Sequence, residues 1–157
     1  MDDPEILVTR QKIHGTNGSV YGAELRERLP DCEITVAETP AEERDRLQTA
    51  DIATGLELTP SQLEQADSLD LFACVYAGTG HLDLDAFEER DVAVTNASGV
   101  HTTNIAEYVV GAMISMAQQF PLAYEQTERR EWRSYPTREL HGSTAAVVGL
   151  GAIGRGI

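Results

Sequence analysis

Short apolar runs that alternate with helical segments are the feature that most constrains how this chain folds. Five runs have strand-like composition, at residues 6–9, 33–36, 52–54, 71–76 and 92–95. Alternation of this kind is typical of βαβ units, which build a parallel sheet. We therefore predict a flavodoxin-like, doubly wound α/β layer over residues 1–98, with right-handed crossover connections.

Two of the intervening helices begin with a recognisable capping sequence. Thr39 is followed by Pro40, and Glu42 stands three residues after the threonine. A threonine at the N-cap and an acid at the third helical position satisfy each other's free backbone N–H groups. Proline suits the first helical position, because it has no N–H to satisfy there. Thr59 and Gln62, with a proline between them, repeat the arrangement. Both sites predict helix starts.

The predicted sheet directs attention to the loops at the carboxyl ends of its strands, where ligands bind in folds of this kind. These loops are residues 9–10, 54–55, 76–79 and 96–99. In the third, Gly78 and Gly80 allow a tight turn and leave successive N–H groups free to hold an anion. The alternative is a plain turn from strand to helix.

A longer amphipathic helix is predicted from Ile105 to Phe120, after the pattern changes at Gly99. Its apolar residues at helical spacing are Ile105, Val109, Met113, Met116 and Phe120. We expect Asn104 to cap this helix and Glu107 to return the bond, which makes Glu107 a capping residue rather than a general base. Pro121 is expected to limit the helix.

A polar stretch follows, in which Trp132 lies between arginines. This indole either stacks on a partner subunit or covers its own domain, and we favour the partner.

The end of the chain carries the most specific chemical signal. A strand-like run from Ala145 to Val148 leads into Gly149-x-Gly151-x-x-Gly154. The first glycine permits a tight turn, the second lets the backbone approach a pyrophosphate, and the third lets a helix pack on the strand. The helix N-terminus then supplies donors to the phosphates. The acid that selects NAD over NADP is expected about 20 residues further on, past Ile157.

A dinucleotide domain needs more strands and helices after such a glycine turn. We therefore expect the sequence to be the N-terminal part of a longer protein. Residues 99–157 would then be the incomplete beginning of an NAD(P)-binding domain.

Charge excludes several classes of partner. The chain has 26 acidic and 12 basic residues, a net charge of -14, and Lys12 is its single lysine. Such a surface repels nucleic acids and anionic membranes. It is typical of proteins that work at molar salt, although an ordinary acidic cytosolic protein is the alternative. No apolar run approaches the roughly 20 residues of a membrane span, so we expect a soluble protein. The acidic N-terminal residues lack the pattern of a secretory signal, so we expect the protein in the cytoplasm. Cys32 and Cys74 are expected in the core.

Several motifs together resemble the D-isomer-specific 2-hydroxyacid dehydrogenase family. Residues 77–85 resemble its A-G-V-D-H-L-D-L-D loop, with Gly80 where an aspartate is often found, and residues 94–99 resemble its V-x-N-x-x-G turn. Residues 104–107 are similar to its A-E helix start, and residues 132–150 to its W-x(n)-E-L-x-G-x-T-x-x-I-x-G-x-G segment. The resemblance covers residues 68–157, while residues 1–67 match only in pattern.

The resemblance implies a substrate domain interrupted by a domain that binds NAD or NADP. The N–H groups of Ala77 and Gly78 would hold the carboxylate of a 2-keto acid or 2-hydroxy acid. The further residues that it places on the substrate side are Thr54, Gly55, Tyr76, Thr79 and His101. Those that it places at the cofactor are Ile105 at the nicotinamide and, at the pyrophosphate, Gly149, Gly151, Ala152, Ile153 and Gly154.

The family's catalytic Arg, Glu and His would all lie beyond Ile157. None of His14, His81, His101 and His141 occupies the family's position, and their spacing offers no metal site. The resemblance therefore implies part of an oxidoreductase that moves hydride between NAD(P)H and a 2-keto acid or D-2-hydroxy acid. The 157 residues alone would be inactive, and the helix from Ile105 to Phe120 would help to build a homodimer. The alternatives are phosphite or formate oxidation and a non-catalytic, corepressor-like module that senses dinucleotide.

Overall fold

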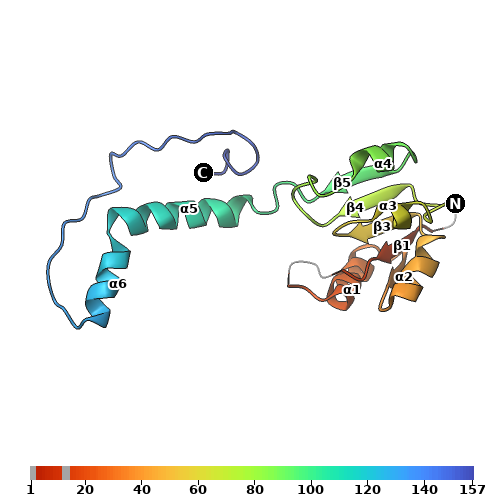
Figure 1. The fold of residues 1–157 in the computed structure, drawn as a ribbon, viewed down its shortest axis with the longest axis horizontal. Coiled ribbons are helices and arrows are strands. Elements are labelled where there is room, and N and C mark those ends of the chain that lie inside the picture. Colours follow the sequence, from red (N-terminus) through yellow and green to blue (C-terminus); the bar gives the residue numbers. More distant parts are fainter. Residues whose placement is uncertain (1–2, 12–14) are drawn as a thin grey trace. The chain divides into compact units, whose positions relative to one another are not determined.

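A computed structural model describes residues 3–11 and 15–157 (Figure 1). The chain divides into two compact units, Met1–Ser98 and Gly99–Ile157. Each unit is described by itself.

A parallel sheet forms the centre of the first unit. Its five strands within the described residues are β1 (Glu5–Val8), β2 (Glu33–Val36), β3 (Ile52–Gly55), β4 (Leu71–Cys74) and β5 (Ala93–Asn96). They lie in the order β2-β1-β3-β4-β5 (Figure 1), and every neighbouring pair is parallel. This is the order of flavodoxin-like, doubly wound sheets. The predicted fold class is confirmed.

β2 has the predicted bounds, and the other four strands differ from the predicted ones by one or two residues at an end. β1 ends at Val8 and β4 ends at Cys74. One ladder hydrogen bond continues past each end, from Thr9 N to Thr54 O at 2.9 Å and from Val75 N to Gly55 O at 3.0 Å. The chain then leaves the sheet, so the carboxyl edge begins at these residues.

Four helices connect the strands in the described part of this unit: α1 (Gly18–Arg28), α2 (Pro40–Leu47), α3 (Pro60–Leu63) and α4 (Leu84–Glu88). Thr39 caps α2 as predicted, accepting from Glu42 N, but the Glu42 carboxylate accepts from Glu38 N instead of returning the bond. At α3 the complete capping box forms, because Thr59 N donates to Gln62 Oε1 at 3.0 Å.

The core has two parts, because alternate strand residues point to opposite faces of the sheet. Leu7 and Phe72 belong to the larger cluster, which α2, α3 and α4 cover with Leu47, Leu63 and Phe87. The Phe72 and Phe87 rings stack with centroids 5.4 Å apart. Ile6, Val8 and Ile34 form the smaller cluster, with Tyr21 and Leu25 of α1 packed against it. Both cysteines are free thiols; Cys74 is buried as expected, whereas Cys32 is only half-buried.

The second unit begins with α5 (Thr102–Ala117). This helix starts three residues earlier than predicted, because Gly99 at φ 88° turns the chain and accepts from Thr102 N at 3.1 Å. His101 is the N-cap and makes no side-chain cap bond. Asn104 and Glu107 lie inside the helix, so the predicted capping box is wrong.

A second helix, α6 (Phe120–Glu128), was not predicted. Gln119 adopts φ 53° between α5 and α6 and ends the first helix. Phe120 therefore belongs to α6 and not to α5. Pro121 lies in the first turn of α6, where a missing N–H costs nothing, so it starts a helix instead of limiting one.

The predicted strand at residues 145–148 is wrong in this structure. Those residues are exposed and have no ladder. A strand needs a partner, and within the described residues none pairs with this segment. After it the chain makes turns and no helix; Arg155 N donates to Gly151 O at 3.1 Å.

No helix in the described ranges is long and apolar enough to cross a membrane.

Candidate functional site

The loop after β4 lies at the carboxyl edge of the sheet and is bonded to the end of β5. Ala97 N donates to Tyr76 O at 3.0 Å, and Asn96 Nδ2 donates to Ala77 O at 2.8 Å. These two bonds tie the start of the loop to the end of β5. Gly78 is exposed and Ala77 is half-buried.

Two adjacent backbone donors in this loop are available to a ligand. Among the described residues, neither the Ala77 N–H nor the Gly78 N–H donates a hydrogen bond. A Cβ built on Gly78 meets nothing within 4 Å. We call the N–H groups of Ala77 and Gly78 the amide nest. Successive free N–H groups in a turn can hold an anion such as a carboxylate.

Tyr76 and His81 flank the amide nest. The Tyr76 side chain is 40% exposed. Its ring meets the His81 ring edge-on, with centroids 5.6 Å apart and an interplanar angle of 68°. Thr79 is half-buried, and its carbonyl accepts from Leu82 N at 2.9 Å. The structure thus brings Tyr76, Ala77, Gly78 and Thr79 of the predicted substrate site into one loop.

Thr54 and Gly55 have packing roles that the sequence did not indicate. Thr54 is buried, and its Oγ1 donates to Ala73 O at 2.9 Å and lies 3.2 Å from Tyr21 Oη. Gly55 is also buried, and a Cβ there would lie 1.8 Å from Thr9 Oγ1. Because Thr54 and Gly55 are buried, the residues after β3 that reach the carboxyl edge of the sheet are Leu56 and Glu57.

Side chains far away in the sequence hold the Leu56–Glu57 turn. The N–H groups of Leu56 and Glu57 both donate to Gln11 Oε1 at 3.1 Å. On the other side, His81 Nε2 donates to Leu56 O at 2.8 Å. The bonded residues are 45, 46 and 25 positions apart in the sequence, so no local sequence pattern predicts these hydrogen bonds.

Glu43 is a second residue that sequence reasoning missed. Its carboxylate is buried, accepting from Arg10 N at 2.6 Å and from Gln62 Nε2 at 3.0 Å. Charge-assisted bonds of this kind stabilise a buried carboxylate. Glu43 therefore links the loop after β1 to α3.

In the second unit, the glycine-rich turn forms without the strand and the helix predicted on either side of it, but its first glycine has a positive φ. Gly149 adopts φ 94°, a conformation that favours glycine. A Cβ on Gly154 would lie 1.9 Å from Gly149 O, whereas one on Gly151 would meet nothing within 4 Å. The turn is therefore tightly packed at its third glycine, Gly154, and open beside its second, Gly151.

The start of α5 packs against this turn. Thr102 Oγ1 donates to Ala152 O at 3.4 Å, and a Cβ on Gly156 would lie 2.3 Å from Thr102 Cγ2. Ile105, which was predicted at the cofactor, is half-buried one helical turn after Thr102. His101, predicted on the substrate side, is half-buried at the N-cap of the same helix.

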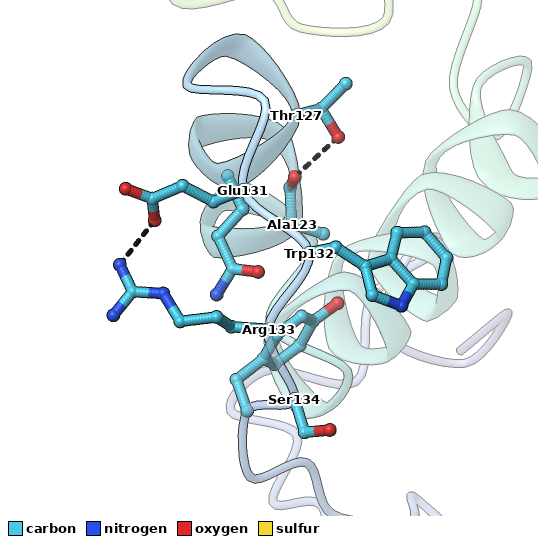
Figure 2. Close-up of a pocket in the computed structure, with 8 residues that line it drawn as sticks. Ala123, Thr127, Glu131, Trp132, Arg133 and Ser134 are labelled. Atoms are coloured by element: carbon cyan, nitrogen blue, oxygen red, sulfur yellow. Dashed lines mark hydrogen bonds and ion pairs between the residues drawn. The ribbon is translucent and has the colours of Figure 1, made fainter.

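A hollow of about 340 Å³ lies where the chain leaves α6, and Figure 2 shows the residues that line it. Arg133 Nη2 and Glu131 Oε2 lie 2.6 Å apart on one side, and Thr127 Oγ1 donates to Ala123 O at 2.9 Å on another. The Trp132 indole points away from these pairs (Figure 2) and is 101% exposed. Its own unit does not cover it.

No group of three His, Cys, Asp or Glu side chains in the described part of the chain is placed to hold a metal ion. His14, one of the four histidines considered from the sequence, lies outside the described residues.

Comparison with known proteins identifies the family. The profile of the D-isomer specific 2-hydroxyacid dehydrogenase catalytic domain matches residues 19–149. The chain belongs to this family. The match begins well before residue 68, so it extends the resemblance into the part of the chain that agreed only in pattern.

The similarity to individual members of the family covers different fractions of this chain and of their own chains. The D-3-phosphoglycerate dehydrogenase of Methanocaldococcus jannaschii is 28% identical over 136 residues, which is 83% of this chain and 26% of that protein. A crystal structure of a D-isomer specific 2-hydroxyacid dehydrogenase family protein from Aeromonas salmonicida is 29% identical, with a TM-score of 0.78. It covers 99% of this chain, and the match is 49% of that chain.

The NAD-dependent formate dehydrogenase of Staphylococcus aureus, solved in complex with NAD, has the same fold at 20% identity and a TM-score of 0.66. It covers 97% of this chain, and the match is 51% of that chain. The chain thus spans about half the length of these solved relatives and about a quarter of the archaeal one.

Proposed function

We propose that this chain is part of an oxidoreductase that transfers hydride between NAD(P)H and a 2-keto acid or D-2-hydroxy acid. In this proposal residues 1–98 bind the substrate, and residues 99–157 begin the domain that binds the cofactor. The amide nest of Ala77 and Gly78, in a chain of the 2-hydroxyacid dehydrogenase family, is the observation that carries the proposal.

The amide nest suits a carboxylate in a strongly acidic protein. With a net charge of -14, the average field of the chain repels anions. Two adjacent backbone N–H dipoles supply local positive potential without a cationic side chain. Tyr76, Thr79 and His101 are proposed to bound the rest of the substrate, together with the backbone near Thr54 and Gly55.

The glycine-rich turn is proposed to hold the pyrophosphate of NAD or NADP. The open space at Gly151 lets a phosphate approach the backbone, and Gly149, Ala152, Ile153 and Gly154 complete the turn. Ile105 is proposed to face the nicotinamide. When bound, the dinucleotide supplies or accepts the hydride, and the chain's own residues bind and orient it.

We assign no catalytic acid or base to the 157 residues. Because the chain spans about half the length of its solved relatives, we propose that the Arg, Glu and His that complete the family's chemistry are not among these residues. The isolated chain should therefore bind substrate without turning it over.

The second unit is proposed to contribute to a homodimer in the cytoplasm. Among its described residues Ala117 is the one buried hydrophobic side chain. Its exposed large apolar side chains include Tyr108, Met116, Phe120, Tyr124 and Trp132. Exposed apolar area on this scale is typical of a surface that binds protein. Sedimentation equilibrium should give twice the mass of 17.1 kDa, and Trp132→Ala should shift the chain toward monomer; a wild-type monomer at every concentration would contradict the dimer.

Calorimetric titration of the chain with pyruvate tests the substrate proposal. We expect saturable binding of pyruvate and none of acetone, which lacks the carboxylate. Gly78→Ala should weaken binding roughly tenfold or more, because its methyl group occupies the open space at the amide nest. Gly80→Ala is the matched control, since a Cβ there also meets nothing within 4 Å.

Equal effects of the two substitutions would contradict a role for the amide nest. Binding of dinucleotide without binding of any 2-keto acid would instead favour a dinucleotide-sensing module. Oxidation of NADH or NADPH by the isolated chain with a 2-keto acid would contradict the proposed absence of turnover.

A further inference from the structure

The orientation of the amide nest is set by the two carbonyl groups that share its peptide planes. The six atoms of a peptide unit are coplanar, so fixing a C=O fixes the N–H of the next residue. The Tyr76 carbonyl shares its plane with the Ala77 N–H, and the Ala77 carbonyl shares its plane with the Gly78 N–H. A hydrogen bond to the carbonyl group in the same peptide plane can thus fix the direction of each N–H group of the amide nest.

Both carbonyls are held from the end of β5. Ala97 N donates to Tyr76 O at 3.0 Å, and Asn96 Nδ2 donates to Ala77 O at 2.8 Å. A carbonyl oxygen only accepts, so the Asn96 side chain must present its NH₂ group there. The first of these bonds joins two backbone groups and does not depend on a side chain, whereas the second depends on the Asn96 side chain.

The bond from Asn96 to Ala77 O is important because the residue after Ala77 is a glycine. Gly78 follows the held carbonyl, and Gly80 comes two residues later; a Cβ on either meets nothing within 4 Å. Glycines give such a segment more backbone freedom than other residues would, and ordering it on binding costs conformational entropy. Without the Asn96 bond, the Ala77–Gly78 peptide plane is free to rotate and the Gly78 N–H loses its direction.

The far end of the segment is anchored as well. His81 Nε2 donates to Leu56 O at 2.8 Å, and Leu56 N is itself bonded to Gln11 Oε1 at 3.1 Å. The His81 ring also meets the Tyr76 ring. A side chain therefore holds each end of the glycine segment. Asn96 bonds to the carbonyl before Gly78, and His81, which follows Gly80, bonds to Leu56 O.

We propose that Asn96 is a positioning residue for the amide nest, which orients the Gly78 N–H through the Ala77–Gly78 peptide plane, with His81 as the second anchor. The proposal rests on the proposed function for its ligand, a 2-keto monocarboxylate. Its structural part, the ordering of Gly78, does not depend on any ligand.

The test compares Asn96→Ala, Asn96→Gln and His81→Phe with the wild-type chain. Asn96→Ala removes the donor, Asn96→Gln keeps an NH₂ group one methylene further out, and His81→Phe keeps a ring beside Tyr76 but loses the bond to Leu56 O. Asn104→Ala is the matched control, since Asn104 is exposed on α5 and its side chain makes no hydrogen bond in the described structure.

Two quantities are measured, the pyruvate Kd by calorimetry and the ¹⁵N order parameter of Gly78 in the ligand-free chain. One lost hydrogen bond corresponds to roughly a 3- to 10-fold weaker Kd. We expect that loss in Asn96→Ala, together with a fall in the Gly78 order parameter from the rigid range of about 0.85 toward about 0.6. Asn96→Gln should recover part of both, and His81→Phe should loosen Gly80 more than Gly78.

A Gly78 order parameter unchanged by Asn96→Ala would overturn the proposal, even if pyruvate binds. A residue that only stabilises the fold would lower the melting temperature without this local loss of order. If the wild-type chain binds no pyruvate, the proposed function fails, and the order parameter still decides whether Asn96 positions the loop.

Discussion

At the scale of single residues, contacts decide which glycines serve the fold and which serve a ligand. Gly55 is the last residue of β3 and Gly78 follows β4, but the first is buried against Thr9 and the second faces open space. The sequence placed both in the substrate site, because composition shows a glycine without showing its neighbours. Gly78 was identified from its loop, whereas the roles of Asn96 and Gln11 depend on bonds across 19 and 45 residues.

Gly55→Ala should destabilise the first unit by about 1–3 kcal/mol, the usual cost of overpacking a core. Its methyl group would lie 1.8 Å from Thr9 Oγ1, a hydroxyl that is buried without a hydrogen-bond partner. Urea denaturation at fixed salt measures the change. The double variant Thr9→Ala/Gly55→Ala should regain most of the loss, because neighbouring substitutions are not additive; purely additive losses would contradict the contact.

At the scale of elements, the features that the sequence predicted correctly are those that residues a few positions apart determine. The five strands and the caps at Thr39 and Thr59 were found because apolar runs and capping residues act within a few positions. The start of α5 was placed too late because Asn104 matched a cap that His101 occupies. The strand at residues 145–148 was wrong because pairing is non-local, and an apolar run alone does not make a ladder.

Thr39, which caps α2, and Asn104, which was wrongly predicted to cap α5, give opposite expectations. Thr39→Ala should cost about 1 kcal/mol, because it leaves the Glu42 N–H without the acceptor it has at 3.2 Å. Asn104→Ala should change stability by less than about 0.5 kcal/mol, as for most surface substitutions. Thermal melts of the two variants measure both values. A large loss from Asn104→Ala would show that it caps α5 after all.

At the scale of the whole molecule, charge is the dominant property. Of the basic residues 11 are arginine and one is lysine, and the net charge of -14 is spread over 157 residues. Self-repulsion of this size opposes the compact state at low ionic strength. The few ion pairs that the structure describes, such as Arg28 with Glu24, are mostly exposed and contribute little.

We therefore expect the free energy of unfolding to rise with KCl from 0.1 M to 2 M, as the screening length falls from about 10 Å to below about 3 Å. Melting temperatures across a KCl series measure this. A melting temperature independent of KCl would contradict adaptation to high salt.

The central claim is that the N–H groups of Ala77 and Gly78 hold the carboxylate of a 2-keto acid. Its most direct test is a ¹H–¹⁵N titration of the chain with pyruvate, with acetone as the control. The account predicts saturable downfield shifts of the Ala77 and Gly78 amide protons, the largest in the first unit, and none with acetone. Shifts that avoid these two residues while pyruvate binds elsewhere would contradict it.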